Sequence, residues 1–301
     1  MKKIGDVLLN DKYWKSEYDD TDSKVGSLLL EYLSQTKNPL EIISMDNRWP
    51  VLYHMSPIRK NIVEWYPFKK NAEILEIGSE SGVLTEVLCR NAKSVTCIEQ
   101  SKQLSVVNAT RNQNFSNLEI IIGSMKEIQL EQCFDYITLI GYLEYVRCFE
   151  DSKNPFVSFL KEIKKYLKKD GKILLAVQNK FGLKYWAGHA EDHTGEYFAS
   201  IEGYNREKEK ADSFSKNELK KIISEAGYQC QDFYYPFPEY KFPQQIFSDK
   251  FLPKEDDIIC SRDSYDYDKY QTFDETAAFR NIIQSGYFDI FANSFFVELS
   301  Q

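Results

Sequence analysis

Short apolar runs alternate with amphipathic stretches through the middle of the chain. Five runs have the length and composition of buried strands, at residues 73–77, 94–98, 118–122, 134–140 and 172–177. Apolar residues at helical spacing lie between them, near residues 83–90, 103–111 and 155–167. Strands that alternate with helices in this way predict an α/β fold with a doubly wound, mostly parallel sheet.

Two later segments extend this predicted sheet. Residues 229–235 and 293–299 have the composition of strands. A helix begins at Ser215, where a glutamate three residues later completes the pattern of a capping box. We therefore expect seven strands, five of the parallel type followed by an antiparallel pair.

The regions that flank the alternating pattern are less regular. Helical stretches at 25–34 and 58–66 surround an aromatic segment marked by proline, and the region before the last strand is rich in aromatic residues and proline. We expect four parts: an N-terminal helical and aromatic cover at 1–70, the α/β domain itself at 71–235, an inserted aromatic cover at 236–290 and the last strand of the sheet at 291–301.

Composition and charge exclude several classes of protein. A content of 43% apolar residues is enough to bury a core, which excludes intrinsic disorder. The 38 Lys and Arg residues against 46 Asp and Glu give a net charge of −8, which disfavours binding to nucleic acid. No apolar stretch approaches the roughly 18 to 20 residues that span a bilayer, and the N-terminus lacks the apolar core of a signal peptide. We expect a cytoplasmic protein without membrane insertion.

The cysteines agree with a reducing compartment. They stand at positions 89, 97, 133, 148, 230 and 260, with no CxxC pair and no Cys/His spacing typical of a zinc site. Three of them lie inside apolar runs, where a buried thiol is the simplest interpretation. We expect no metal and no disulfide.

The most informative string follows the first predicted strand. It reads Ile-Leu-Glu-Ile-Gly-Ser-Glu-Ser-Gly over residues 74–82, and the second strand ends in Glu99. Glycines at this place let a ligand approach the backbone at a helix N-terminus, and an acid about 20 residues further on can bind both hydroxyls of a ribose. The pattern predicts a ligand that contains adenosine.

Charge decides between the cofactors that contain adenosine. A dinucleotide places its pyrophosphate on a G-x-G-x-x-G turn, whereas this turn is G-x-x-x-G and carries Glu80 at the second glycine position. A carboxylate repels a diphosphate. It tolerates S-adenosylmethionine, which carries a sulfonium and an ammonium, and we therefore expect S-adenosylmethionine as the cofactor.

On these residues the chain resembles the class I S-adenosylmethionine-dependent methyltransferases. The resemblance implies that Glu76, Gly78 and Gly82 hold the methionine part of the cofactor and that Glu99 binds the ribose. It also implies an adenine contact after the third strand and a segment at 135–146 that flanks the transferable methyl group. The complete set of expected cofactor contacts is Glu76, Gly78, Ser79, Gly82, Glu99, Gln100, Ser124, Met125 and Gly141.

A narrower resemblance lies in residues 178–188, 191–195 and 201–204. These segments are similar to a methyltransferase group found with glycosyltransferases in bacterial surface-polysaccharide gene sets. The resemblance implies a small-molecule or glycan-precursor acceptor, methylated on oxygen, and association with glycosyltransferases. Nitrogen on a nucleobase is disfavoured, because the fourth strand leads into Gly-Tyr-Leu-Glu at 141–144 and not into the Asn/Asp-Pro-Pro-Tyr/Phe loop of amino-methylating enzymes.

Transfer to a hydroxyl benefits from a general base at the acceptor. His193 is one candidate, with Asp192 beside it to orient the imidazole, and its alternative role is that of a structural or substrate-ordering loop residue. Glu144 is another candidate, and its alternative is a solvated acid at a helix start. Tyr185 and Trp186 either stack on a sugar face or pack in the core. His189 is the remaining candidate for substrate binding.

Two rival functions remain open. One is an NAD-dependent oxidoreductase or epimerase on the same architecture, which the turn disfavours and for which Tyr142 and Tyr145 lack a lysine four residues on. The other is a binding protein that keeps the fold without transfer activity, because Glu80 replaces the middle glycine.

Overall fold

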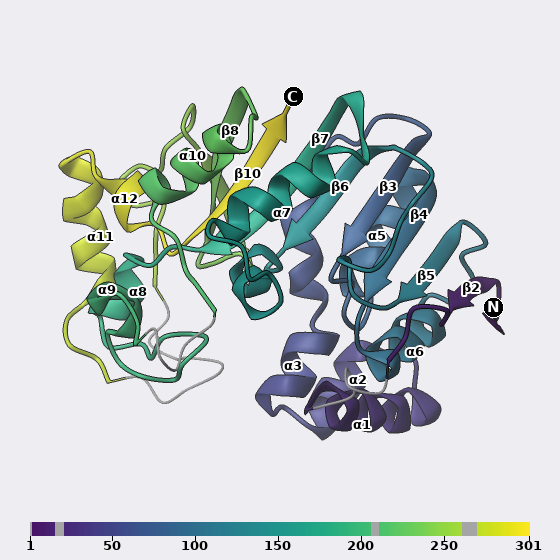
Figure 1. The fold of residues 1–301 in the computed structure, drawn as a ribbon. Helices are drawn as coiled ribbons and strands as arrows, with labels where there is room; N and C mark the ends of the chain where they lie inside the picture. Colours follow the sequence, from purple (N-terminus) through teal and green to yellow (C-terminus); the bar gives the residue numbers. More distant parts are fainter. Residues whose placement is uncertain (1, 16–20, 206–210, 261–269) are drawn as a thin grey trace. The chain divides into compact units, whose positions relative to one another are not determined.

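The computed structural model describes residues 2–15, 21–205, 211–260 and 270–301 (Figure 1). The chain forms two compact units, and each is described by itself. The first unit comprises Met1–Leu139 and Tyr166–Lys172, and the second comprises Ile140–Lys165 and Ile173–Gln301.

The first unit contains a sheet with strand order β1-β2-β5-β4-β3-β6. Its strands are β1 (Lys2–Ile4), β2 (Val7–Asn10), β3 (Ala72–Ile77), β4 (Ala92–Glu99), β5 (Leu118–Ile122) and β6 (Phe134–Ile140). All pairs are parallel except β1 with β2, and the apolar side chains of the central strands are buried on both faces. Burial on both faces explains why these strands occur in the sequence as continuous apolar runs.

The register brings the ends of three strands level. Ile77 lies opposite Ile98, and Glu99 lies opposite Ile122. The segments that follow β3, β4 and β5 therefore leave the sheet at the same edge, where ligands bind in open α/β folds.

Helices of the first unit pack on this sheet and on one another. They are α1 (Thr21–Gln35), α2 (Pro39–Met45), α3 (Trp49–Met55), η2 (Pro57–Lys60), α4 (Asn61–Glu64), α5 (Val83–Asn91) and α6 (Lys102–Arg111). An apolar cluster that includes Leu29, Ile42, Met55 and Leu104 joins α1, α2 and α3 to α6. Figure 1 shows these four helices grouped together. The predicted helices at 25–34 and 58–66 are confirmed, the second as η2 followed by α4.

The second unit has the strand order β7-β10-β8-β9. Its strands are β7 (Leu167–Gln178), which begins in the first unit, β8 (Cys230–Phe237), β9 (Gln245–Ser248) and β10 (Ser294–Ser300). The strand β8 is antiparallel to both β10 and β9, which confirms the predicted antiparallel pair. Its helices are η3 (Leu143–Cys148), α7 (Pro155–Lys164), α8 (Leu183–Trp186), α9 (Ala199–Glu202), α10 (Lys216–Glu225), α11 (Glu275–Gln284) and α12 (Phe288–Phe291).

The prediction of seven strands was wrong. The described residues contain ten, because β1 and β2 form a hairpin within the predicted N-terminal cover and β9 lies in the inserted region. These three strands have only three or four residues each, which is too short for a periodic pattern to emerge.

Two further findings concern helix length and thiols. No helix in the described ranges combines the length and apolar character required to cross a bilayer. Cys89 and Cys97 are buried, whereas Cys133 and Cys148 are exposed. The side chain of Cys230 lies outside the part of the chain that the structure describes.

Candidate functional site

The turn between β3 and α5 has an unusual backbone. Gly78, Glu80 and Gly82 adopt φ values of 79°, 47° and 78°. Glycine adopts such angles readily, whereas they strain a glutamate. At Gly82 a side chain would also collide with Asn108 on α6, so the turn packs directly against that helix. The predicted glycine turn is thus in place, with Glu80 in the conformation that suits a glycine.

Contacts on both sides hold Glu80 in this conformation. One carboxylate oxygen is 2.9 Å from Nη1 of Arg59, and the other accepts a hydrogen bond of 3.1 Å from the Tyr53 hydroxyl. Burial alone would raise the pKa of Glu80, but the guanidinium of Arg59 outweighs it and holds that pKa below its usual range. The sequence argument treated Glu80 as an uncompensated negative charge. The structure corrects this, because Arg59 neutralises it.

Glu99 links the turn to the start of α6. Its two carboxylate oxygens accept hydrogen bonds from the backbone N–H groups of Glu80, at 2.8 Å, and Ser101, at 2.9 Å. The position at the end of β4 is the one expected for a ribose-binding acid, and Glu99 also orders the turn, a role the sequence did not reveal.

Glu76 faces the layer between the sheet and α5. Its carboxylate accepts hydrogen bonds from Thr85 Oγ1, at 2.6 Å, and Cys97 Sγ, at 3.2 Å. Burial raises the pKa of Glu76 to about 7. Asn108 extends the network with a 3.0 Å hydrogen bond to Thr85. This predicted cofactor residue therefore also ties the turn to its supporting helices.

The other expected cofactor residues of the first unit lie at the same edge of the sheet. Ser79 is buried, and its hydroxyl has no hydrogen-bond partner within the described ranges, which is the state expected of a group that meets a ligand. Gln100 follows β4, and Ser124 and the buried Met125 follow β5. The backbone N–H of Gly123 donates to Glu99 O at 2.9 Å and fixes the exit of β5. The structure thus gathers these expected residues at one edge of the sheet.

Glu144 lies in the second unit, in η3, and is fully buried. It accepts hydrogen bonds from the backbone N–H of Gln178 and, at 3.0 Å, from the Tyr240 hydroxyl. Burial raises the pKa of Glu144 to about 7. The alternative of a solvated acid at a helix start was wrong. Gly141, expected at the cofactor, leaves room for the same tyrosine, since a Cβ there would lie 2.8 Å from the Tyr240 hydroxyl oxygen.

His193 stands beside Glu144. Its Nε2 is 3.8 Å from a carboxylate oxygen of Glu144 and forms no hydrogen bond with the described residues, and its Nδ1 is 3.3 Å from the Tyr145 hydroxyl. We expected Asp192 to orient this imidazole. The structure corrects that expectation, because the Asp192 carboxylate binds two lysines instead.

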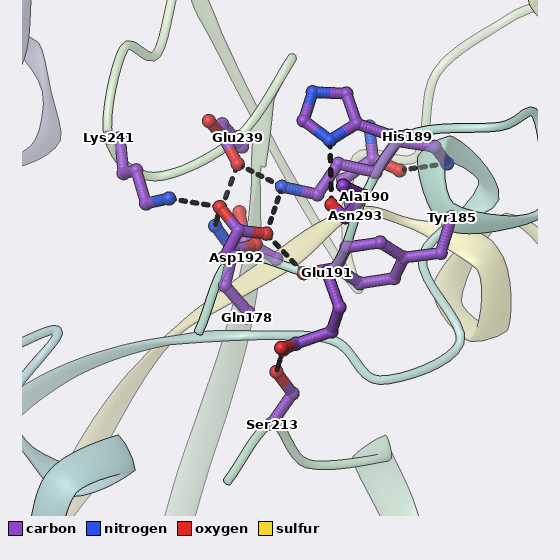
Figure 2. Close-up of polar contacts among 12 residues, drawn as sticks. Gln178, Tyr185, His189, Ala190, Glu191, Asp192, Ser213, Glu239, Lys241 and Asn293 are labelled. Carbon is purple, nitrogen blue, oxygen red and sulfur yellow. Dashed lines mark hydrogen bonds and ion pairs between the residues drawn. The ribbon is translucent and has the colours of Figure 1, made fainter. Parts of the chain in front are cut away.

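The carboxylate of Asp192 is the centre of a buried polar cluster in the second unit (Figure 2). Lys184 donates to Asp192 at 2.7 Å and to Glu239 at 2.5 Å, and Lys241 and the Tyr185 hydroxyl also donate to Asp192. Burial would raise the pKa of Asp192, but the two lysines hold it well below its usual range. We call this the Asp192 cluster; its members are Gln178, Lys184, Tyr185, Asp192, Glu239 and Lys241.

Glu191 was missed by the sequence reasoning. One of its carboxylate oxygens accepts from the backbone N–H groups of His193, at 2.9 Å, and Thr194, at 3.0 Å. The other accepts from the hydroxyls of Tyr204, at 2.9 Å, and Ser213, at 3.2 Å. The Glu191 carboxylate closes a turn over residues 192–194, where no helix begins, so no local capping pattern in the sequence identifies it. Glu191 thereby fixes the loop that carries Asp192 and His193.

The expected substrate residues differ in exposure. Tyr185 is fully buried, whereas Trp186 is 41% exposed and its carbonyl accepts a hydrogen bond from Thr272 at 2.9 Å. Nδ1 of His189 is 2.9 Å from the Ala190 carbonyl oxygen. Of this pair of aromatic residues, Trp186 is the one with a surface available for stacking.

Comparison with known proteins agrees with the geometry of the glycine turn. Residues 52–232, more than half of the chain, match a family described as a methyltransferase domain. A ubiquinone biosynthesis O-methyltransferase of Pelagibacter ubique (strain HTCC1062) is 28% identical over an alignment of 147 positions, which covers 45% of this chain and 58% of that protein. The chain therefore spans less than two thirds of the length of this curated relative.

Two solved structures are similar in fold. One is an S-adenosylmethionine-dependent methyltransferase from Thermotoga maritima, described as a possible histamine N-methyltransferase, with a TM-score of 0.50 and 13% identity over 87% of this chain and 97% of that one. The other is phosphoethanolamine N-methyltransferase 1 of Haemonchus contortus in complex with phosphoethanolamine and S-adenosylhomocysteine, with a TM-score of 0.48 and 16% identity over 74% of this chain and 47% of that one.

The family match and the glycine turn agree with the sequence prediction of the enzyme class and support S-adenosylmethionine as the cofactor. The narrower grouping with polysaccharide gene sets stays a prediction. Since more than half of the chain matches the family, the chain belongs to the methyltransferase domain family.

Proposed function

We propose that the protein is an S-adenosylmethionine-dependent O-methyltransferase that methylates a hydroxyl group of a saccharide or glycan precursor. The observation that carries this proposal is the buried pair of Glu144 and His193, with Nε2 of His193 directed at a carboxylate and without a hydrogen bond among the described residues. A base of this kind is useful for a hydroxyl, which is a weak nucleophile, and an amine does not require it.

The residues of the two units have separate tasks in this proposal. The cofactor supplies a methyl group on a positively charged sulfur, which leaves as a neutral thioether. The turn at 78–82 and Glu99 bind the nucleoside, as their geometry in the first unit supports. In the second unit, His193 accepts the proton of the acceptor hydroxyl as the new carbon–oxygen bond forms, and Glu144 stabilises the resulting imidazolium.

The loop that carries His193 is preorganised for this task. Glu191 holds its backbone, and the Asp192 cluster fixes the neighbouring side chain. A base that is held in place before the acceptor binds needs no reorganisation during the reaction. The named O-methyltransferase relative supports oxygen as the acceptor atom, and the exposed Trp186 offers a ring for a sugar face.

The acceptor class follows from the narrower sequence resemblance. That resemblance supports a glycan precursor and association with glycosyltransferases, and the net charge of −8 is consistent with an acceptor other than nucleic acid. We also propose a cytoplasmic location, which the cysteine pattern, typical of a reducing compartment, supports.

The test is methyl transfer from isotopically labelled S-adenosylmethionine to a panel of acceptors. The panel contains nucleotide sugars, free oligosaccharides, a catechol and a primary amine, and mass spectrometry locates the added methyl group. We expect a methyl ether on a saccharide. Methylation of the amine alone would refute the assignment to oxygen, and methylation of the catechol alone would refute the saccharide.

Variants of the proposed base complete the test. His193→Gln is expected to lower kcat by about 10²- to 10⁴-fold. Glu196→Gln, an exposed residue three positions further along the same loop, is the control and is expected to leave kcat within a few-fold of the wild type. An equal effect of both substitutions would refute the role of His193.

A further inference from the structure

The side-chain amide of Gln178 has an oxygen without a partner. Gln178 is the last residue of β7 and is completely buried in the second unit. Its Oε1 forms no hydrogen bond with the described residues. A buried amide oxygen nearly always accepts a hydrogen bond, from the protein, from water or from a ligand. This oxygen is therefore open to an N–H or O–H group that the described part of the chain does not supply.

Two acids fix the orientation of this amide (Figure 2). Nε2 of Gln178 donates to Glu239 Oε2 at 2.7 Å and to Asp192 Oδ1 at 3.4 Å. An amide turned by half a rotation would place its oxygen against both carboxylates, which would repel it. The unpartnered atom is therefore the oxygen, which accepts a hydrogen bond but cannot donate one.

A second open group lies at the carboxylate that binds the main chain of Gln178. The backbone N–H of Gln178 donates to one oxygen of Glu144. The other oxygen of Glu144 is 3.8 Å from Nε2 of His193, which also has no hydrogen bond with the described residues. The two open atoms thus belong to residues that flank one buried carboxylate.

A single stretch of chain holds these residues relative to one another. Glu239 accepts from the Gln178 amide, and the next residue, Tyr240, donates through its hydroxyl to Glu144 at 3.0 Å. The backbone N–H of Tyr240 in turn donates to Ser294 Oγ at 2.8 Å. The amide and the carboxylate are therefore preorganised before any ligand binds.

The imidazole of His193 lies one side chain below the surface. The ring of Tyr145 stands edge-on to it, with centroids 5.2 Å apart, and the Tyr145 hydroxyl is 3.3 Å from Nδ1. The His193 side chain is 4% exposed, whereas Tyr145 is 48% exposed. An acceptor can therefore reach the imidazole by displacing one exposed side chain.

We propose that Gln178 is a specificity-determining residue, whose Oε1 accepts a hydrogen bond from a second hydroxyl of the acceptor, next to the hydroxyl that His193 deprotonates. The inference rests on the proposed function, since it takes a saccharide hydroxyl as the methyl acceptor. A saccharide ring carries hydroxyls on neighbouring carbons, so one molecule supplies both the nucleophile and the donor that Oε1 lacks. No bond of the second hydroxyl breaks, and its only task is to position the first.

An oxygen that can only accept selects the acceptor by its chemistry. It favours an O–H or N–H group beside the reacting hydroxyl. It disfavours a deoxygenated, methylated or carbonyl-bearing carbon at that place, which would leave the buried oxygen unpaired. The enzyme is therefore expected to prefer diols to simple alcohols. The alternative is that an ordered water satisfies Oε1 and that Gln178 only supports the Asp192 cluster.

The test uses the saccharides of the acceptor panel, with UDP-glucose as the first, and the monodeoxy analogues of each. The position of the added methyl group identifies the neighbouring hydroxyls. We expect the wild type to lose about tenfold or more in kcat/KM when one of these neighbours is absent. Removal of a remote hydroxyl should change kcat/KM by less than about threefold.

Gln178→Met tests whether Gln178 reads this hydroxyl. Methionine keeps the length of the side chain and removes the amide oxygen. The variant is expected to use the saccharide and its neighbour-deoxy analogue with kcat/KM values within about twofold of each other. This ratio compares two acceptors on one enzyme, so it does not depend on the fraction of the variant that is folded.

Tyr145→Phe is the matched control. It removes a hydroxyl that contacts the same imidazole and leaves the amide of Gln178 in place. Whatever its effect on kcat, it should keep the tenfold preference of the wild type for the saccharide over the neighbour-deoxy analogue.

The other outcomes overturn the proposal. Equal use of every monodeoxy analogue by the wild type would leave a water at Oε1, and this result needs no variant. A tenfold preference that persists in Gln178→Met would assign the recognition to another residue. If the wild type methylated no saccharide, the proposed function itself would fail. That result differs from failure of the subsite, in which a saccharide is methylated regardless of its neighbouring hydroxyls.

Discussion

Glu144→Gln is expected to stabilise the protein at alkaline pH while it removes the proposed partner of His193. Glu144 is fully buried, and burial raises its pKa to about 7 from the ordinary value of 4.5. A glutamine keeps the shape of the side chain. Its carbonyl oxygen can accept from the backbone N–H of Gln178, and its amide can donate to the Tyr240 hydroxyl, which then acts as the acceptor. The substitution thus removes the charge and keeps one hydrogen bond to each of these two partners.

The magnitude follows from the two pKa values. A tenfold change in proton affinity is worth about 1.4 kcal/mol, so ionisation of Glu144 in the folded state costs about 3 kcal/mol. The pKa of Glu144 is higher in the folded state than in the unfolded state. The wild type therefore has its full free energy of unfolding below pH 4.5 and loses about 3 kcal/mol of it as the pH rises through about 7. The glutamine variant has no such loss. Its free energy of unfolding should exceed that of the wild type by about 2 to 3 kcal/mol at pH 8, with little difference near pH 4.5.

Urea denaturation measures this difference. Trp186 lies in the same unit and reports its unfolding by fluorescence when the remaining tryptophans are replaced by phenylalanine. The control is Glu196→Gln, an exposed glutamate of the neighbouring segment, which should show no pH-dependent gain. A difference between Glu144→Gln and the wild type that is the same at both pH values would refute the electrostatic reasoning.

Three further substitutions test other parts of the structure. Asp192→Asn leaves the two lysines of the Asp192 cluster with one acid between them and should lower the free energy of unfolding by about 3 to 5 kcal/mol in urea titrations. Adding Lys241→Met should recover part of this loss, and additive effects of the two substitutions would contradict a shared cluster. Glu99→Ala should weaken S-adenosylhomocysteine and 5′-methylthioadenosine alike, by about 1.5 to 3 kcal/mol in calorimetry, and an unchanged affinity would place the ribose elsewhere. Gly82→Ala forces a side chain at positive φ against Asn108 and should cost about 1 to 3 kcal/mol in thermal unfolding, so a Tm equal to that of the wild type would argue against this packing.

The sequence was sufficient for the parts of the fold that repeat a pattern. All seven predicted strands occur among the ten described ones, because strands buried on both faces are continuous apolar runs. The glycine turn and Glu99 were found because their chemistry depends on spacing along one βαβ unit. The hairpin of β1 and β2 was missed because three or four residues give too little alternation to recognise.

The partners of the site residues were less accessible from the sequence. Asp192 was chosen as the companion of His193 because it is the adjacent residue, whereas the carboxylate nearest the imidazole belongs to Glu144, on a different element. Arg59, which neutralises Glu80, precedes it by a helix and a strand, and no local pattern connects them. Contacts of this kind are set by tertiary packing, which periodicity and motif spacing do not encode.

The loop around His193 is held by two anchors that share no side chain. Glu191 accepts hydrogen bonds from the backbone of the loop, and the Asp192 cluster holds the side chain of the residue before His193. The imidazole itself contributes to neither anchor. A substitution at position 193 therefore leaves both anchors in place, so the proposed base can be exchanged while the loop keeps its conformation.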